Sequence, residues 1–249
     1  MIIFKIYKKL FLKNKFFVFN YNHNSFFEGV YRLLAIIISP LFIKLNPNLI
    51  SFFSLFLGFV AFYLNLFYFF EVQIVLILIL MSFVLDFIDG IVARYNNLST
   101  FFGRFIDGLF DIIVLGLIHI ILFIEIRRNF NFESEINSVP YLITIFVLPI
   151  QHLILDRYSA LARWSNEIQK FSFIKPYVRN SFLNKITMTL FDLKHLCIFF
   201  LIFNKSNLDI LINLFFLVSF LNSFFVILLY FFLSKKHLSL INNQKDNNE

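Results

Sequence analysis

The chain has 249 residues, of which 59% are hydrophobic and only 15% are charged, and it carries a net charge of +7 at pH 7. This balance excludes an ordinary soluble globular protein. Several uncharged runs approach or exceed the roughly 20 residues that a helix needs to cross a bilayer. The single cysteine, Cys197, excludes an intrachain disulfide framework.

The N-terminal region is basic and then amphipathic. The first 25 residues contain five lysines and no acid before Glu28, a composition that suits the anionic cytoplasmic face of a membrane. The stretch from Phe26 to Leu45 is free of charge only between Leu33 and Ile43, which is too short to span, and Pro40 interrupts it. We therefore expect a helix that lies along the membrane interface.

Six membrane-spanning helices are predicted after this helix, because backbone groups in a bilayer must satisfy one another. Their bounds are Leu49–Phe70, Val72–Ala93, Phe101–Ile124, Val139–Leu155, Ile186–Phe203 and Ile210–Leu233. The fifth is the weakest, because Asp192, Lys194 and His195 interrupt it. These three residues fit either a polar network at the membrane interface or the lining of a substrate route.

The sequence thus predicts an all-α integral membrane protein with six transmembrane helices after an N-terminal interfacial amphipathic helix. We divide it into a basic N-terminus with the interfacial helix (1–47), a six-helix domain (48–234) and a polar tail (235–249). Eighteen of the 22 Lys and Arg residues fall on one side of this topology. Positive charge collects on the cytoplasmic side, so both termini are expected there. We expect no nucleic-acid partner.

Four carboxylates stand in this apolar sequence, at Asp86, Asp89, Asp107 and Asp111. Residues three or four apart share a helix face, so each pair forms a stripe on its own helix. A short turn makes the two helices antiparallel neighbours, which predicts that Asp86 meets Asp111 and Asp89 meets Asp107. Carboxylates in a membrane are costly and mark function. Because four of them repel one another, we expect a shared cation, and oxygen-only ligands suit Mg²⁺ or Mn²⁺.

The residues between the carboxylates favour a phosphate-binding pocket. Gly90 and Gly103 let a ring or a phosphate approach the helix backbone, Ala93 keeps the same face open, and Arg94 offers a fork of donors for phosphate oxygens. Two hard cations at such a pocket can neutralise a diphosphate and stabilise its leaving oxygen.

Three other interpretations of the carboxylates fit the sequence less well. A structural ion-pair network is disfavoured because only Arg94 and Arg104 are nearby in sequence. A cation-coupled transporter is disfavoured because the carboxylates gather at one membrane face. A membrane-embedded prenyltransferase also uses paired Asp motifs, but the Gly-x2-Ala-Arg-x8-Gly interior does not suit one.

The pattern Asp-x2-Asp-Gly-x2-Ala-Arg-x8-Gly-x3-Asp-x3-Asp resembles the signature of the CDP-alcohol phosphotransferase (phosphatidyltransferase) superfamily, and all eight positions match at their spacing. The segment Asn46-Pro47-Asn48-Leu49-Ile50-Ser51 also looks like the family's Thr-Pro-Asn-x-x-Thr entry to the first span. The resemblance covers nearly the whole chain, although its specificity is concentrated in residues 46–111.

The resemblance implies a homodimeric transferase of substituted phosphate groups in phospholipid synthesis. It implies that Asp86, Asp89, Asp107 and Asp111 hold a dinuclear Mg²⁺ or Mn²⁺ site, with Asp111 also acting as general base. The CDP pocket would then consist of Gly90, Ala93, Arg94 and Gly103. An alcohol would attack the lipid-linked phosphate of CDP-diacylglycerol and expel CMP. A different donor, such as CDP-inositol, CDP-choline or CDP-ethanolamine, remains open.

The sequence identifies the acceptor alcohol less clearly than the donor. Family branches that use phosphorylated acceptors usually place Lys or Arg directly after the last motif aspartate, where this chain has Ile112. The serine-using branch carries a Ser-Phe-Gly and Pro pattern that is also missing here. Basic residues of the loop before the fifth span, Arg157, Arg163, Lys175 and Arg179, fit either an anionic acceptor or ordinary cytoplasmic charge.

Overall fold

The structure is a computed structural model that describes residues 25–67, 70–129, 138–167, 182–204 and 207–246, with backbone only for 162–167 and 236–246. The basic N-terminal segment up to residue 24 lies outside the described residues. So do Lys175 and Arg179 of the basic loop and the side chain of Arg163.

The described part of the chain is helical and contains the predicted N-terminal amphipathic helix and six long apolar helices. The elements are α2 (Phe26–Ile38), η2 (Ser39–Leu41), α3 (Pro47–Leu66), α4 (Val72–Asn96), α5 (Phe101–Asn129), α6 (Val139–Glu167), α7 (Phe182–Phe203) and α8 (Leu208–Asp246). Helices α3 to α8 are long and apolar enough to cross a membrane. The predicted fold class is confirmed, and the chain is a multi-pass membrane protein.

Several helix ends differ from the predicted bounds. Helix α6 continues to Glu167 instead of ending at Leu155, so Arg157 and Arg163, which were predicted in a loop, belong to this helix. Pro40 ends α2 at Ile38 and begins the short 3₁₀ helix η2, because proline cannot continue the α-helical hydrogen bonding. Helix α8 continues to Asp246, through the start of the segment that was predicted as a polar tail.

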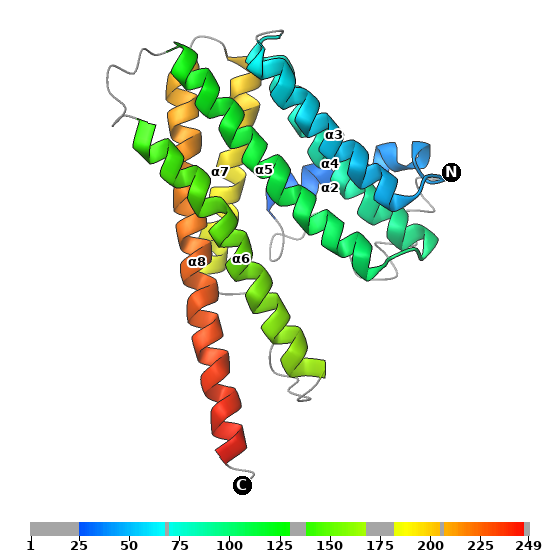
Figure 1. The fold of residues 1–249 in the computed structure, drawn as a ribbon, viewed down its shortest axis with the longest axis vertical. Coiled ribbons are helices and arrows are strands. Elements are labelled where there is room, and N and C mark those ends of the chain that lie inside the picture. Colours follow the sequence, from blue (N-terminus) through cyan, green and yellow to red (C-terminus); the bar gives the residue numbers. More distant parts are fainter. Residues whose placement is uncertain (1–24, 68–69, 130–137, 168–181, 205–206, 247–249) are drawn as a thin grey trace.

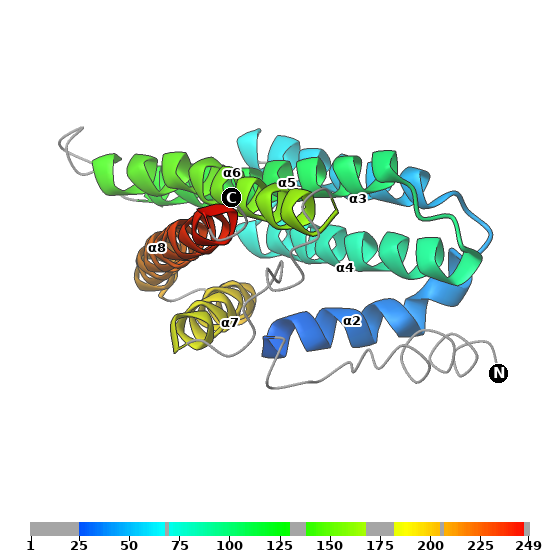
Figure 2. The same ribbon diagram turned by 90° about the horizontal axis from the view of Figure 1, so that it is seen from below.

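The helices form two groups that share a core (Figures 1 and 2). Helix α3 packs against both α4 and α5, α2 packs on α4, and α6 and α7 pack on α8. Seen from below, α2, α4 and the pair α3 and α5 lie in successive layers. The largest buried cluster joins α3, α4, α5, α7 and α8, so the two groups are one hydrophobic unit.

Small residues bring α3 close to its neighbours. Ser54 donates to the Ser82 carbonyl at 2.9 Å and Ser82 donates to the Ser54 carbonyl at 2.8 Å, which locks α3 to α4. A Cβ at Gly58 would meet the Val114 side chain of α5 at 3.2 Å. Close approach through small and hydroxyl residues is the usual way in which membrane helices associate.

Asp192 of α7 fixes the start of α2. Its carboxylate accepts hydrogen bonds from the backbone N–H groups of Phe26 and Phe27, both at 2.9 Å. The Ser25 hydroxyl accepts a third, from Glu28, at 3.1 Å. Because the first N–H groups of a helix have no partner within the helix, Asp192 serves as a cap from another element.

Candidate active site

The connection between α4 and α5 brings the two motif-bearing helix ends together. Asn97 adopts a left-handed conformation, with φ 57°, and the Leu98 N–H donates to the Ala93 carbonyl at 2.8 Å, which ends α4. Thr100 then caps α5, because its hydroxyl accepts from the Gly103 N–H at 2.9 Å. Since α4 extends to Asn96, the connection is shorter than the turn expected from the sequence.

The four predicted aspartates gather between α4 and α5. Carboxylate oxygens of Asp86, Asp89 and Asp107 lie within 4.8 Å of one another. Asp111 interacts with Asp86 and Asp107. Asp89 is buried and the other three are partly buried. The expected meeting of Asp86 with Asp111 is therefore present, and Asp86 also contacts Asp107.

Ser51 of α3 supports this group from a third helix. Its buried hydroxyl donates to the Asp89 carboxylate, and it also lies 3.3 Å from the Pro47 carbonyl. Pro47 follows Asn46, whose side chain accepts from the Asn48 N–H at 3.0 Å and caps α3. The sequence pattern indicates Ser51 only as part of the entry motif. Its hydroxyl, one turn after the start of an apolar span, was the signal that could have marked it as a site residue.

A polar cavity of about 170 Å³ opens next to the aspartates. The predicted pocket residues Gly90, Ala93, Arg94 and Gly103 all line it, together with Asp89 and Asp107. Asp86 and Asp111 stand about one turn deeper on their helices. The remaining lining residues were not predicted as site residues: Pro47, Asn48, Ser51, Leu98, Ser99, Thr100 and Arg104.

Both pocket glycines stand where a side chain would be crowded. A Cβ at Gly90 would lie 3.0 Å from a guanidinium nitrogen of Arg94, which folds back over the helix. A Cβ at Gly103 would lie 3.1 Å from the Thr100 Oγ1 and 3.2 Å from the Asn48 Oδ1. These positions keep the cavity wall at the backbone, as the sequence suggested.

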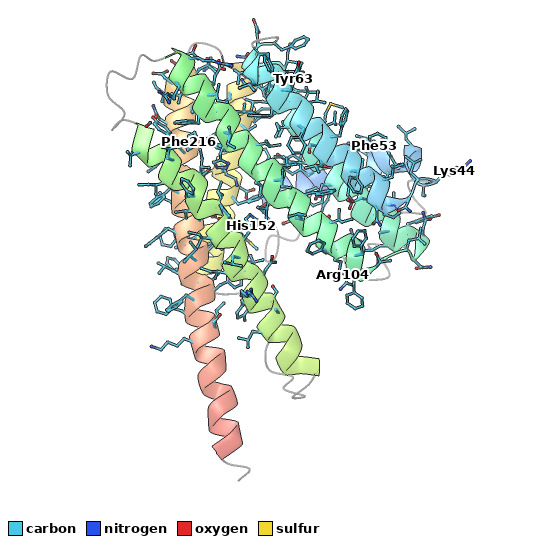
Figure 3. All side chains as sticks on the ribbon, in the orientation of Figure 1. Lys44, Phe53, Tyr63, Arg104, His152 and Phe216 are labelled. Carbon is cyan, nitrogen blue, oxygen red and sulfur yellow. The ribbon has the colours of Figure 1, made fainter. Side chains whose placement is uncertain are left out.

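The charge of the site is unbalanced. The Arg94 guanidinium acts on both Asp89 and Asp107 and attracts them. Arg32 of α2 acts on Arg94 as a like charge, so it also lies near the site, which the sequence did not indicate. Arg104 stands at the start of α5, with its Cζ 5.8 Å from the centre of the Phe101 ring (Figure 3).

The donor set fits a metal. Oxygen ligands on a mutually repelling carboxylate group are what hard divalent cations bind. Asp86, Asp89 and Asp107 could hold such an ion.

Comparisons with known proteins agree with this chemistry. The family model for CDP-alcohol phosphatidyltransferase matches residues 44–221. A CDP-diacylglycerol–glycerol-3-phosphate 3-phosphatidyltransferase from Wigglesworthia glossinidia brevipalpis is 30% identical over 165 residues, which are 65% of this chain and 79% of that protein. No solved structure matches the chain.

The family match runs from just before α3 into α8 and so contains the whole carboxylate group, Ser51 and the polar cavity. The reaction class of the family is the transfer of a substituted phosphate group in phospholipid biosynthesis. The chain belongs to the CDP-alcohol phosphatidyltransferase family.

Proposed function

We propose that this enzyme transfers the phosphatidyl group of CDP-diacylglycerol to a small alcohol and releases CMP. The observation that carries the proposal is the adjacency of two unlike cavities on the same helices. The polar cavity beside the aspartates suits a nucleotide diphosphate, and an apolar cavity of about 690 Å³ suits the acyl chains of the donor.

The apolar cavity supports a lipid donor by its position and lining. It lies between α2, α3, α4 and α7, and its walls include Phe53 (Figure 3), Phe56 and Met81. Leu85 and Ile88 of α4 also line it, and Asp86 and Asp89 lie directly beside them in the chain. A lipid whose chains occupy this cavity would therefore have its phosphates close to the carboxylates.

We assign the residue roles from this geometry and from the family resemblance. Gly90, Ala93, Arg94 and Gly103 bind the CDP moiety, and Arg94 contacts its phosphates. Asp111 accepts the proton of the acceptor hydroxyl as general base. The acceptor oxygen bonds to the phosphorus that carries the lipid, and the bond from that phosphorus to the bridging oxygen breaks, so that CMP leaves.

Asp86, Asp89, Asp107 and Asp111 are the residues that would hold a dinuclear Mg²⁺ or Mn²⁺ site. Such ions, when bound, would neutralise the diphosphate and the departing CMP. Ser51 orients Asp89, because a hydrogen-bonded ligand keeps a fixed direction toward the metal.

We also propose how the chain is oriented in the membrane. The excess of Lys and Arg on one side supports cytoplasmic termini, with the polar cavity open toward the cytosol. A homodimer is proposed from the family resemblance alone.

The test is CMP release by purified protein in nanodiscs. CDP-diacylglycerol is offered with glycerol 3-phosphate, which the curated relative's name contains, and in parallel with serine, inositol, inositol phosphate or choline. Each reaction is run with Mg²⁺, with Mn²⁺ and with EDTA. We expect metal-dependent CMP release with one acceptor. If CDP-diacylglycerol gives none while CDP-choline, CDP-ethanolamine or CDP-inositol does, the donor assignment is wrong.

A further inference from the structure

The wall of the apolar cavity contains two polar side chains, Tyr31 of α2 and His195 of α7. Every other residue that lines the cavity is hydrophobic. Tyr31 is 6% exposed and His195 is 3% exposed, so both are almost fully removed from solvent. Of the polar residues that interrupt the fifth span, His195 therefore lines a candidate substrate cavity, whereas Asp192 caps α2.

The packing of α2 on α7 holds these two side chains against each other. The Tyr31 ring meets the His195 ring edge-on, with 5.5 Å between the ring centres. Asp192 fixes the start of α2 on α7 by accepting from the N–H groups of Phe26 and Phe27, and Figure 2 shows this end of α2 beside α7. Tyr31 follows Phe27 by about one turn, so its place in the cavity wall is set by this contact.

The Tyr31 hydroxyl forms no hydrogen bond to another group in the described part of the chain. Its ring is held by other rings instead. It stacks on Phe87 of α4 with 6.1 Å between the centres, and it is tilted against Phe83 at the same distance. Because buried polar groups normally have a hydrogen-bond partner, a hydroxyl without one in a cavity wall calls for a partner on the ligand.

His195 has the opposite hydrogen-bonding character. Its Nδ1 lies 2.9 Å from the Phe191 carbonyl oxygen. Because a carbonyl oxygen can only accept, Nδ1 carries the hydrogen, and the Nε2 of the neutral ring is an acceptor. Among the side chains that line the cavity, the Tyr31 hydroxyl is therefore the donor that a ligand can use.

Tyr31 lies at the depth of the carboxylates. Its ring partners Phe83 and Phe87 stand about one turn apart on α4, and Asp86 lies between them in the chain. The turn of α4 that carries Asp86 therefore also contacts Tyr31. In a diacylglycerol phosphate, the ester groups are the first polar groups between the phosphate and the acyl chains. A lipid with its phosphates at the carboxylates and its chains in the apolar cavity thus brings an ester to this depth.

We propose that the Tyr31 hydroxyl donates a hydrogen bond to an ester carbonyl of the donor lipid and so selects ester-linked over ether-linked lipids. This inference rests on the proposed function, because that function places the acyl chains in the apolar cavity. A dialkyl lipid of the same length fills the cavity but has no carbonyl, so it leaves the hydroxyl unpaired. A site built to bind a polar group rejects an analogue that lacks this group.

The experiment measures the KM for CDP-diacylglycerol and for a CDP-dialkylglycerol of the same chain length, both from CMP release. The nanodiscs consist of ether-linked phospholipid, so that the surrounding lipid offers no competing ester. The wild type is compared with Tyr31→Phe, which removes only the hydroxyl, and with the control Tyr63→Phe. Tyr63 is an exposed residue of α3 and does not line the cavity, whereas Phe53 of the same helix does (Figure 3).

The KM of the wild type should be about 3- to 10-fold lower for the ester donor than for the ether donor, the factor expected for one neutral hydrogen bond. Tyr31→Phe should raise the KM for the ester donor by this factor and change the KM for the ether donor less than about twofold. Tyr63→Phe should keep the wild-type ratio. An unchanged ratio in folded Tyr31→Phe protein would overturn the proposal, and so would equal KM values in the wild type.

His195→Phe separates a hydrogen bond from an effect of packing, because it keeps a ring beside Tyr31 but removes the ring nitrogens. We expect the KM values for both donors to change by the same factor. Loss of the preference for the ester in His195→Phe, together with an intact preference in Tyr31→Phe, would overturn the proposal. The thermal midpoint controls folding. Tyr31→Phe should unfold at the wild-type temperature or higher, because it removes an unpaired buried hydroxyl.

A binding readout separates this inference from the proposed function. Phosphatidic acid carries the same esters and a phosphate but no nucleotide. With Mg²⁺ present, it should raise the thermal midpoint of the wild type and of Tyr63→Phe more than its dialkyl analogue does, whereas Tyr31→Phe should respond equally to both lipids. If the wild type releases no CMP from CDP-diacylglycerol with any acceptor, the proposed function fails, while this difference still supports the role of Tyr31. If turnover is normal and both lipids shift the wild type equally, the ester contact fails and the function stands.

Discussion

The polar cavity beside the aspartates and the apolar cavity under α2 are built from adjoining faces of the same helices. On α4, Asp89, Gly90 and Ala93 line the first, whereas Leu85 and Ile88 line the second. On α3, Ser51 faces the first, while Phe53 and Phe56 face the second. Because a helix has 3.6 residues per turn, neighbours in the chain such as Ile88 and Asp89 point in different directions. One lines the apolar cavity and the other lines the polar cavity.

The two cavities also differ in how strongly their walls depend on particular side chains. The polar cavity is small, and its wall depends on single atoms such as the Ser51 hydroxyl and the missing side chain of Gly103. The apolar cavity is larger and lined by many interchangeable hydrophobic side chains. Substitutions should therefore have sharp effects in the first and gradual effects in the second, because directional bonds tolerate less change than apolar contact.

The largest effect is expected for Asp111→Asn, which keeps the shape of the side chain but removes its basicity. Loss of a general base should lower kcat about 10²- to 10⁴-fold, and CMP release under saturating substrates measures it. Asp209→Asn at the start of α8 is the control for losing a carboxylate elsewhere. Normal turnover by folded Asp111→Asn protein would refute the base assignment.

A smaller effect is expected for Ser51→Ala, which removes the hydroxyl bonded to Asp89. Loss of a residue that orients a metal ligand typically weakens metal binding about 10- to 100-fold. Titration of activity with Mn²⁺ should show this weakening. Ser54→Ala is the matched control, because Ser54 is buried on the same helix but bonds to Ser82. Equal Mn²⁺ requirements in the two variants would contradict the role of Ser51.

Gly103→Ala should narrow the polar cavity, since the new Cβ meets Thr100 and Asn48. Overpacking on the order of 1 kcal/mol would raise the KM for the CDP donor by roughly fivefold to tenfold. Gly108→Ala on the same helix is the control, because nothing lies within 4 Å of its Cβ. That variant should be more stable by about 0.5–1 kcal/mol. If both alanines behave alike, the cavity wall at Gly103 has no role in binding.

The smallest effect is expected in the apolar cavity. Met81→Trp should partly fill it and raise the KM for a long-chain donor a few-fold, on the order of 1 kcal/mol. A short-chain CDP-diacylglycerol should be affected less, so the ratio of the two KM values is the measurement. Ile74→Trp, which faces outward on α4 and does not line this cavity, serves as the control. An unchanged ratio for Met81→Trp would argue that the acyl chains lie elsewhere.

The sequence by itself determined the spans and the local part of the site. A long apolar run predicts a membrane helix, because a helix must cross the apolar core of the bilayer. Helices α3 to α8 follow such runs. The positions of the four aspartates, Gly90 and Gly103 follow from helical periodicity across one short turn between α4 and α5. These features are local, so a spacing rule is enough to place them.

Only the tertiary structure decided which distant residues join that local group. Three contacts depend on how helices far apart in the chain pack together: Ser51 on Asp89, Arg32 near Arg94, and Asp192 on the start of α2. Spacing along a chain carries no information about such contacts, because side-chain shape and small residues at the crossings set the packing of the helices. The carboxylate group could therefore be predicted from spacing along the chain, whereas the residues that support it from other helices could be found only in the tertiary structure.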